Sequence, residues 1–377
     1  MNFKKISALI LSLVMIFSII PFAYAESSVT RIIAGSDFQH PDGNANGQKT
    51  VSAIIGSMKN DGVGSADALI FCGDYDHDLT MNSICTSQGI KALTEVTDTF
   101  VDPSAQHIFV QGNHDSSLKK VAGLAPSGNN DPENGKYGVF VINEDDYIWV
   151  NPSREVVRVT ADNLRNYLNE KLEQNFTAPV FVVSHLPLHY TCRTRNFGDA
   201  KYASYIFDVI NEAGAKGLNI FFLYGHDHAS GWDDYLGGAA VCLEKGETLN
   251  VCEGNQLKFK ECTLNFTYLN AGFTGYYDNH NGGDDALTMT LFEIRDDSVT
   301  ISRYDKNGKH NLSSAGVRNE YKNEKGYDPN TNVKESGFVV PLTQISDNTP
   351  IEGEMSFITK IFNAFLTIIK NLFGGVC

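Results

Sequence analysis

Five short polar turns, each directly after an apolar run, carry the residues of this chain that could perform chemistry. They span residues 36–39, 73–78, 112–115, 184–189 and 225–228. Within them, the side chains that could bind a metal ion are Asp37, Asp74, Asn113, His185, His226 and His228. Mixed oxygen and imidazole ligands of this kind suit divalent transition metals. The turns therefore predict a metal centre, and the turn at 225–228 completes its ligand set.

The combination of ligands favours a pair of metal ions over a single ion. Such a pair needs a bridging carboxylate, and Asp74, on a tight glycine turn, is the best candidate. His226 and His228 reach the same side if their segment is extended, because alternate residues of an extended chain share a face. Bound metal can lower the pKa of a water to ~7, and two ions can clamp phosphate oxygens. The predicted chemistry is therefore hydrolysis of a phosphate ester.

The segments between the turns indicate an α/β domain. Apolar runs predict strands at residues 30–35, 68–72, 107–110, 179–183 and 219–224. Helical spacing of apolar residues predicts helices at 48–59, 82–100, 162–176 and 200–213. After His228 the pattern becomes antiparallel β, with strands at 266–270, 287–294 and 299–304. Each polar turn thus lies at the carboxyl end of a predicted strand, where α/β sheets bind their ligands.

The order and spacing of these motifs resemble the calcineurin-like metallophosphoesterase superfamily. That family shows Asp-x-His, Gly-Asp, Gly-Asn-His-Asp or -Glu, a single His, and Gly-His-x-His, and the resemblance extends over about residues 31–304. It implies a four-layer αββα sandwich, in which two mixed β-sheets are flanked by helices. It also implies a hydrolase that uses hydroxide bridging two divalent ions, which would be manganese, zinc or iron.

The resemblance further implies a role for each motif residue. One metal would be held by Asp37, Gln39, Asp74 and His228. The second metal would be held by Asp74, Asn113, His185 and His226. The imidazole of His114 would lie outside both ligand sets, where it would protonate the leaving oxygen or stabilise its developing charge.

Two positions depart from the family pattern. Gln39 stands where the family usually has His, and a glutamine oxygen is a weaker ligand for zinc than imidazole. The first metal is therefore expected to be loosely held, or to be manganese or magnesium. The Asp that orients the third-motif histidine in many family members is replaced by His77, so we predict that Asp78 is the catalytic partner of His114.

The two ends of the chain differ in character from the rest. Lys4 and Lys5 precede an apolar run that ends in Ala23-Tyr24-Ala25, which is typical of a secretory signal and its cleavage site. An uncleaved membrane anchor is the alternative. We predict four segments: a signal peptide at 1–25, the metallophosphoesterase domain at 26–328, a linker at 329–353 and an amphipathic helix at 354–377. The protein is accordingly expected to be secreted or associated with the cell surface.

The C-terminal segment places Phe357, Phe362 and Phe365 on an apolar stripe, with Lys360 and Lys370 opposite. The two lysines argue against a membrane span. The stripe suits contact with a membrane or cell surface as an interfacial helix, and docking on the domain is the alternative.

The formal net charge of −15 argues against a nucleic-acid-binding module, because Lys and Arg bind phosphate backbones. The same charge does not exclude a phosphate-ester substrate, since two divalent ions would supply positive charge where the phosphate binds. Three of the seven cysteines, Cys242, Cys252 and Cys262, are close in sequence, and we predict a disulfide between two of them.

The class of phosphate ester is left open by the sequence. A nucleotidase with a large substrate domain of its own is disfavoured, because too few residues follow His228. We favour phosphodiesters as substrates, and a phosphomonoesterase using the same site is the alternative. A catalytically degraded surface or binding protein that retains the fold is the competing class, and Gln39 is the residue that motivates it.

Overall fold

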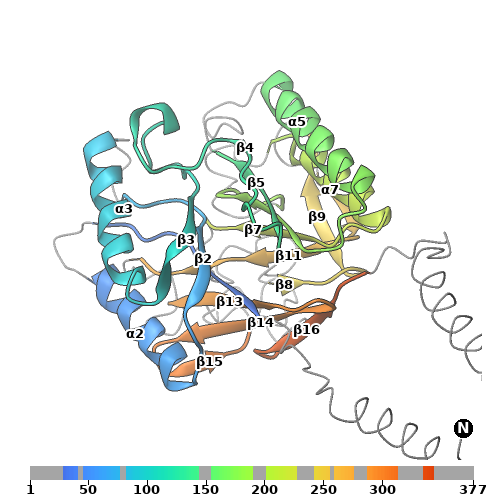
Figure 1. Cartoon of the computed structure of the whole chain (residues 1–377). Helices are drawn as coiled ribbons and strands as arrows, with labels where there is room; N and C mark the ends of the chain where they lie inside the picture. The colour runs from blue at the N-terminus through green and yellow to red at the C-terminus, as the bar shows by residue number, and fades with distance from the viewer. Residues whose placement is uncertain are drawn as a thin grey trace, which may run out of the picture.

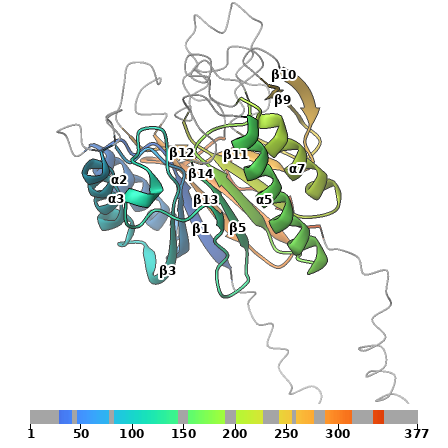
Figure 2. The ribbon, with the colours of Figure 1, turned by 90° about the horizontal axis from the view of Figure 1, so that it is seen from above.

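Two β-sheets face each other in this protein, and helices cover their outer faces (Figure 1). One sheet is covered by α2 (Asn46–Asn60) and α3 (Ser83–Thr97), the other by α5 (Arg154–Glu173) and α7 (Ala203–Ala215), as Figure 2 shows from above. The predicted four-layer αββα sandwich is thereby confirmed. The computed structural model describes residues 29–40, 46–76, 82–143, 154–189, 201–226, 242–254, 259–275, 287–312 and 334–343.

The first sheet has the strand order β15-β14-β13-β1-β2-β3. Its strands are β1 (Thr30–Gly35), β2 (Ala66–Phe71), β3 (Val101–Phe109), β13 (Thr288–Ile294), β14 (Ser298–Asp305) and β15 (Gly308–His310). Strands β1, β2 and β3 are parallel, whereas β13 runs antiparallel to β1. The short β12 (Gly272–Phe273) also pairs with β13.

The second sheet has the order β4-β5-β6-β7-β11-β8. Its strands are β4 (Gly128–Asn129), β5 (Gly138–Ile142), β6 (Val180–Ser184), β7 (Ile220–Tyr224), β8 (Cys242–Leu243) and β11 (Thr267–Asn270). The central β5, β6, β7 and β11 are parallel, so their carboxyl ends lie at one edge. A separate hairpin is formed by β9 (Thr248–Cys252) and β10 (Phe259–Thr263).

The core has three layers, one between the two sheets and one between each sheet and its covering helices. In the layer between the sheets, large aromatic side chains interlock. Phe181 of β6 packs against Phe292 of β13 with ring centroids 5.2 Å apart, and Phe221 of β7 contacts both rings. Strands covered on both faces have few positions for polar residues, which explains why they appear in the sequence as continuous apolar runs. The apolar positions predicted for the first helix, including Val51 and Ile54, are fully buried under the first sheet.

Part of the predicted linker at 329–353 belongs to the domain instead. Strand β16 (Phe338–Pro341) pairs antiparallel with β14, and the Leu342 N–H donates to the Asp297 carbonyl at 2.8 Å. The linker prediction is therefore wrong for residues 334–343. The predicted signal peptide and C-terminal helix lie outside the described residues. Within the described part of the chain, no helix is long and apolar enough to cross a membrane.

The predicted disulfide is not formed. Cys242 and Cys262 both carry free thiols. Every pairing among Cys242, Cys252 and Cys262 requires one of these two residues, so the prediction is wrong. In the backbone register of the hairpin, Cys262 pairs with Leu249 and Cys252 pairs with Phe259, so no cysteine of the hairpin is opposite another.

Candidate metal centre

The polar turns meet at the carboxyl ends of β1, β2, β3, β6 and β7. Backbone hydrogen bonds join them directly: the Asp37 N–H donates to the Gly73 carbonyl at 2.9 Å, and the Gly225 N–H donates to the His185 carbonyl at 3.0 Å. The Gln39 N–H donates to the Asp74 carbonyl at 2.9 Å. The His226 N–H donates to Oδ2 of Asp37 at 3.1 Å and joins the turns of the second sheet to those of the first, so all of them form one connected layer.

The backbone of these turns is unusual. Of the six non-glycine residues with positive φ in the described part of the chain, four are predicted ligands: Asp37 (54°), Gln39 (51°), Asp74 (59°) and His226 (69°). Non-glycine residues rarely adopt this left-handed region, and such strain is concentrated at functional sites.

Close packing explains the glycines of the motifs. A Cβ on Gly112 would overlap the Asp74 carboxylate and lie 2.5 Å from the Asp74 backbone nitrogen. A Cβ on Gly73, whose φ is +87°, would lie 2.7 Å from Nδ1 of His185. Only glycine lets the turns approach closely enough for their side chains to share one centre.

Four predicted ligands of the second metal converge at this centre. Asp74, His185 and His226 are buried, and each offers a ligand atom within 4.8 Å of the other two. Oδ1 of Asn113 lies 2.9 Å from Nε2 of His185 and 2.9 Å from Nδ1 of His226. Nε2 of His185 lies 3.3 Å from Oδ2 of Asp74.

The chemistry of this donor set fits a cation. Nδ1 of His185 lies 2.6 Å from the Cys72 carbonyl oxygen, which can only accept, so Nδ1 carries the proton. When the ring is neutral, as a metal ligand must be, Nε2 presents a lone pair toward the oxygens of Asn113 and Asp74. When the ring is protonated in the absence of metal, the same nitrogen donates toward Asp74. A bound divalent ion would satisfy these facing acceptors, and a backbone carbonyl that fixes the imidazole is a common feature of metal sites.

Asp74 is ionised in this environment. Burial raises the pKa of its carboxyl group, but the charges and hydrogen bonds of His185 and His114 lower it more. The net effect is a pKa well below the ordinary value. A permanently charged carboxylate at the centre suits a shared metal ligand.

The first metal position is described only in part. Oδ2 of Asp37 accepts from the Ser36 hydroxyl at 2.5 Å and from the His226 N–H at 3.1 Å, which fixes the carboxylate beside the ligand cluster. Gln39 is buried on the same turn. Asp37 is not a member of the 4.8 Å group, and His228 lies outside the described residues.

His114 lies beside the shared ligand. Its Nε2 is 3.8 Å from Oδ2 of Asp74, and its backbone N–H donates to Oδ1 of Asp74 at 3.0 Å. The side chain retains 19% exposure, so it can reach a group bound at the surface of the centre. Its predicted partner Asp78 lies outside the described residues.

Asp115 is a site residue to which the sequence analysis gave no role. Its buried carboxylate accepts from four backbone N–H groups, those of Asp74, Tyr75 and Gly112 at 2.8 Å and that of Asp76 at 3.3 Å. Burial and the charge of Asp74 raise the pKa of Asp115 to about 7, while the N–H groups of Gly112 and Tyr75 lower it. The sequence feature that could have identified Asp115 is its place as the last residue of the Gly-Asn-His-Asp motif.

His189, on the same turn as His185, belongs to the packing of the second sheet. Its Nδ1 lies 2.8 Å from the Tyr268 hydroxyl, which also accepts from the Leu188 N–H. The ring contacts Tyr224 and Tyr268 edge to face. Burial lowers the pKa of His189 to about 3, so the imidazole is neutral in the folded protein.

The family model for calcineurin-like phosphoesterases matches residues 30–230, more than half of the chain. The chain therefore belongs to the calcineurin-like phosphoesterase family, as the motifs predicted, and is a metal-dependent phosphoesterase. None of the curated proteins compared with the chain matches it.

Solved structures resemble this chain at low identity. A dimetal phosphatase from Danio rerio is 11% identical, with a TM-score of 0.47, and the match covers 75% of this chain and 98% of that chain. GAP50, described as the anchor in the inner membrane complex of Plasmodium, is 11% identical, with a TM-score of 0.41 and coverage of 80% and 91%. A predicted phosphoesterase from Streptococcus pneumoniae is 13% identical, with a TM-score of 0.29 and coverage of 74% and 92%.

Proposed function

We propose that this protein is an exported phosphoesterase that acts preferentially on phosphodiesters and binds two divalent metal ions. The observation that carries the proposal is the convergence of Asp74, Asn113, His185 and His226 on one buried point, with the lone pair of His185 turned inward by the Cys72 carbonyl.

Each of these residues has a defined part in the proposed reaction. Asp74, Asn113, His185 and His226 would hold one ion, and Asp37, Gln39, Asp74 and His228 the other. When bound, the ions would activate a water molecule and neutralise the phosphate. Nε2 of His114 would donate a proton to the leaving oxygen or hold its negative charge, since the imidazole lies beside Asp74 and is partly exposed.

Gln39 supports a difference in metal affinity between the two proposed metal positions. An amide oxygen replaces an imidazole in the first ligand set, whereas the second set keeps both histidines. We infer that the first ion is held more weakly, and that manganese is preferred there over zinc.

The same residue motivates the competing function, a binding protein with a degraded site. Hydrolysis of bis-p-nitrophenyl phosphate and p-nitrophenyl phosphate, measured with added manganese or zinc, separates the two. Metal-stimulated turnover that is lost in His226→Ala and retained in His310→Ala, on the outer strand β15, supports the enzyme. No turnover of any ester by the fully metal-loaded protein would reject the enzyme.

The ratio of the two rates also decides the substrate class. Faster turnover of the diester supports the proposed phosphodiesterase. Faster turnover of the monoester would assign the phosphomonoesterase alternative to the same residues.

We further propose that the protein acts outside the cytoplasm and contacts a membrane or cell surface through residues 354–377. The apolar stripe and its lysines support this interfacial role. A chain that ends before Glu354 should shift from the cell-bound to the soluble fraction. An unchanged distribution would indicate that the helix docks on the domain.

A further inference from the structure

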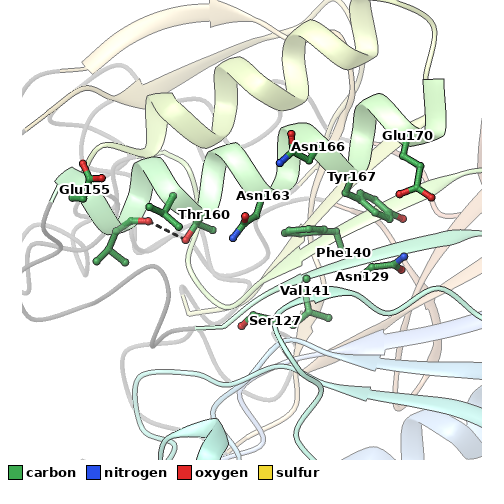
Figure 3. A pocket seen from close by; sticks show the side chains of 13 residues that line it. Ser127, Asn129, Phe140, Val141, Glu155, Thr160, Asn163, Asn166, Tyr167 and Glu170 are labelled. Atoms are coloured by element: carbon green, nitrogen blue, oxygen red, sulfur yellow. Dashed lines mark hydrogen bonds between the residues drawn. The ribbon is translucent and has the colours of Figure 1, made fainter. Parts of the chain in front are cut away.

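A groove of about 570 Å³ lies between helix α5 and the strands β4 and β5 (Figure 3). Its floor includes Phe140 and Tyr167, whose ring centroids are 5.2 Å apart. Its volume falls within the range of small-molecule sites. None of its lining residues is a candidate metal ligand, so the groove is a feature separate from the proposed hydrolytic site.

Helix α5 presents a second face to this groove. Leu164 and Leu168 pack into the core, whereas Val159, Asn163 and Asn166 line the groove. Val159 is 47% exposed. Figure 3 shows Asn163 extending from the helix on the side that faces the strands. The side-chain amides of Asn163 and Asn166 form no hydrogen bonds within the described part of the chain and are therefore available to a ligand.

The charges of the groove argue against an anionic ligand. Glu155 and Glu170 lie at its two ends, roughly 22 Å apart along the helix at 1.5 Å per residue. No Lys, Arg or His is among its lining residues. Glu155 pairs with Arg158 at 2.6 Å, so its charge is partly compensated. No cation lines the groove to hold a phosphate ester, and a neutral ligand fits the lining.

The edge strand argues against an added peptide strand. The Asn130 side-chain amide donates to the carbonyl of Gly128 at 3.0 Å, and Oδ1 of Asn129 accepts from the Asp131 N–H at 2.8 Å. Gly128 has a φ of +103°, which is not extended. Strand addition needs a row of extended backbone with available groups, and β4 offers neither feature.

We propose that this groove binds a neutral oligosaccharide. The amides of Asn163 and Asn166 can both donate and accept, as sugar hydroxyls require. The Thr160 hydroxyl lies on the same wall and donates to the Val156 carbonyl at 3.1 Å. Val159, which is 47% exposed at the rim, would contact the C–H face of a sugar ring.

Saturation-transfer NMR and calorimetry on the full-length protein test this proposal with cellotetraose, chitotetraose and maltotetraose. Tetragalacturonate serves as the acidic probe and an extended Val/Lys octapeptide as the peptide probe. The double variant Asn163→Ala, Asn166→Ala removes the amides at exposed positions. Asn169→Ala, on the same helix but outside the groove, is the matched control.

At least one neutral oligosaccharide should bind saturably at concentrations of about 1 mM. The double variant should weaken that binding by about fivefold or more, since two hydrogen bonds are lost, and Asn169→Ala should leave it unchanged. His226→Ala should also leave it unchanged, which separates the groove from the hydrolytic site. The proposal is overturned if no neutral oligosaccharide binds, if the double variant binds as the control does, or if only the peptide or the acidic sugar binds.

Discussion

Asp115→Asn offers the sharpest test of how the metal centre is built. Oδ1 of Asp115 accepts from the Tyr75 and Asp76 N–H groups, and Oδ2 accepts from those of Asp74 and Gly112. An amide has one accepting oxygen, so two of these four donors lose their acceptor in either orientation of the side chain. The NH₂ group should face Tyr75 and Asp76, because the Asp76 bond, at 3.3 Å, is the longest of the four.

The loss of stability comes from the two backbone N–H groups that lose their acceptor. A buried donor without an acceptor costs about 1–3 kcal/mol, and removing a charge repelled by Asp74 offsets part of this loss. We expect Asp115→Asn to lower the free energy of unfolding by about 2–4 kcal/mol. Because the displaced backbone carries Asp74, manganese affinity should fall by about 10–100-fold.

Calorimetric titration of the metal-free protein with manganese measures the affinity, and urea unfolding measures the stability. Asp131→Asn is the matched control, because Asp131 is also a part-buried carboxylate with several partners: the Val139 N–H, the Tyr167 hydroxyl and the Lys171 ammonium. It lies at the amino end of β5, away from the metal turns, so its loss should reduce stability alone. Equal manganese affinity in the two variants would refute a positioning role for Asp115.

Three further predictions concern other parts of the molecule. Gln39→His should raise zinc affinity by about tenfold or more relative to manganese, and calorimetry with each metal checks this; an unchanged ratio would mean that residue 39 is not a ligand. His189 has a folded-state pKa of about 3, below its value of ~6.5 in unfolded chains, so the unfolded state takes up the proton first as pH falls. The contribution of His189 to the free energy of unfolding is therefore full above pH ~6.5. Acidification reduces that contribution by about 2 kcal/mol between pH 7 and 5. His189→Gln should remove this part of the pH dependence in urea unfolding, and a wild-type slope would contradict the assignment. A chain ending at residue 333 should be about 2–4 kcal/mol less stable than one ending at 343, because it lacks β16 and the buried Leu342; equal unfolding midpoints would refute a structural role for β16.

The sequence predicted the sandwich and the location of the site because both depend on strong local patterns. Apolar runs long enough to be buried on both faces mark the central strands, and a polar turn must follow where each run leaves the sheet. The sequence singled out Asp74, Asn113, His185 and His226 as candidate ligands because such side chains at consecutive strand ends have few other roles, and in the structure they lie together.

The features that the sequence did not predict depend on contacts between distant segments. Strand β16 has only four residues, alternates between half-buried and exposed positions and ends at Pro341, so its composition resembles a linker. Its pairing with β14 is set by the finished sheet and not by its own residues. The role of Asp115 likewise requires that the turn after β2 meet the turn after β3, which local spacing does not show.

The hydrogen bonds between the turns hold several of the predicted ligands in a strained, left-handed conformation. A left-handed non-glycine residue costs about 1–3 kcal/mol, and four predicted ligands adopt this conformation. The contacts that maintain it come from the protein: the Asp37 N–H bonds the Gly73 carbonyl, the Gln39 N–H bonds the Asp74 carbonyl, and Asp115 gathers four N–H groups. A side chain at position 112 would overlap Asp74, so the two turns can approach this closely only with glycine there. The backbone therefore fixes the positions of the candidate ligands in advance, and we expect metal affinity at this site to depend on residues, such as Asp115, that would not touch the ion.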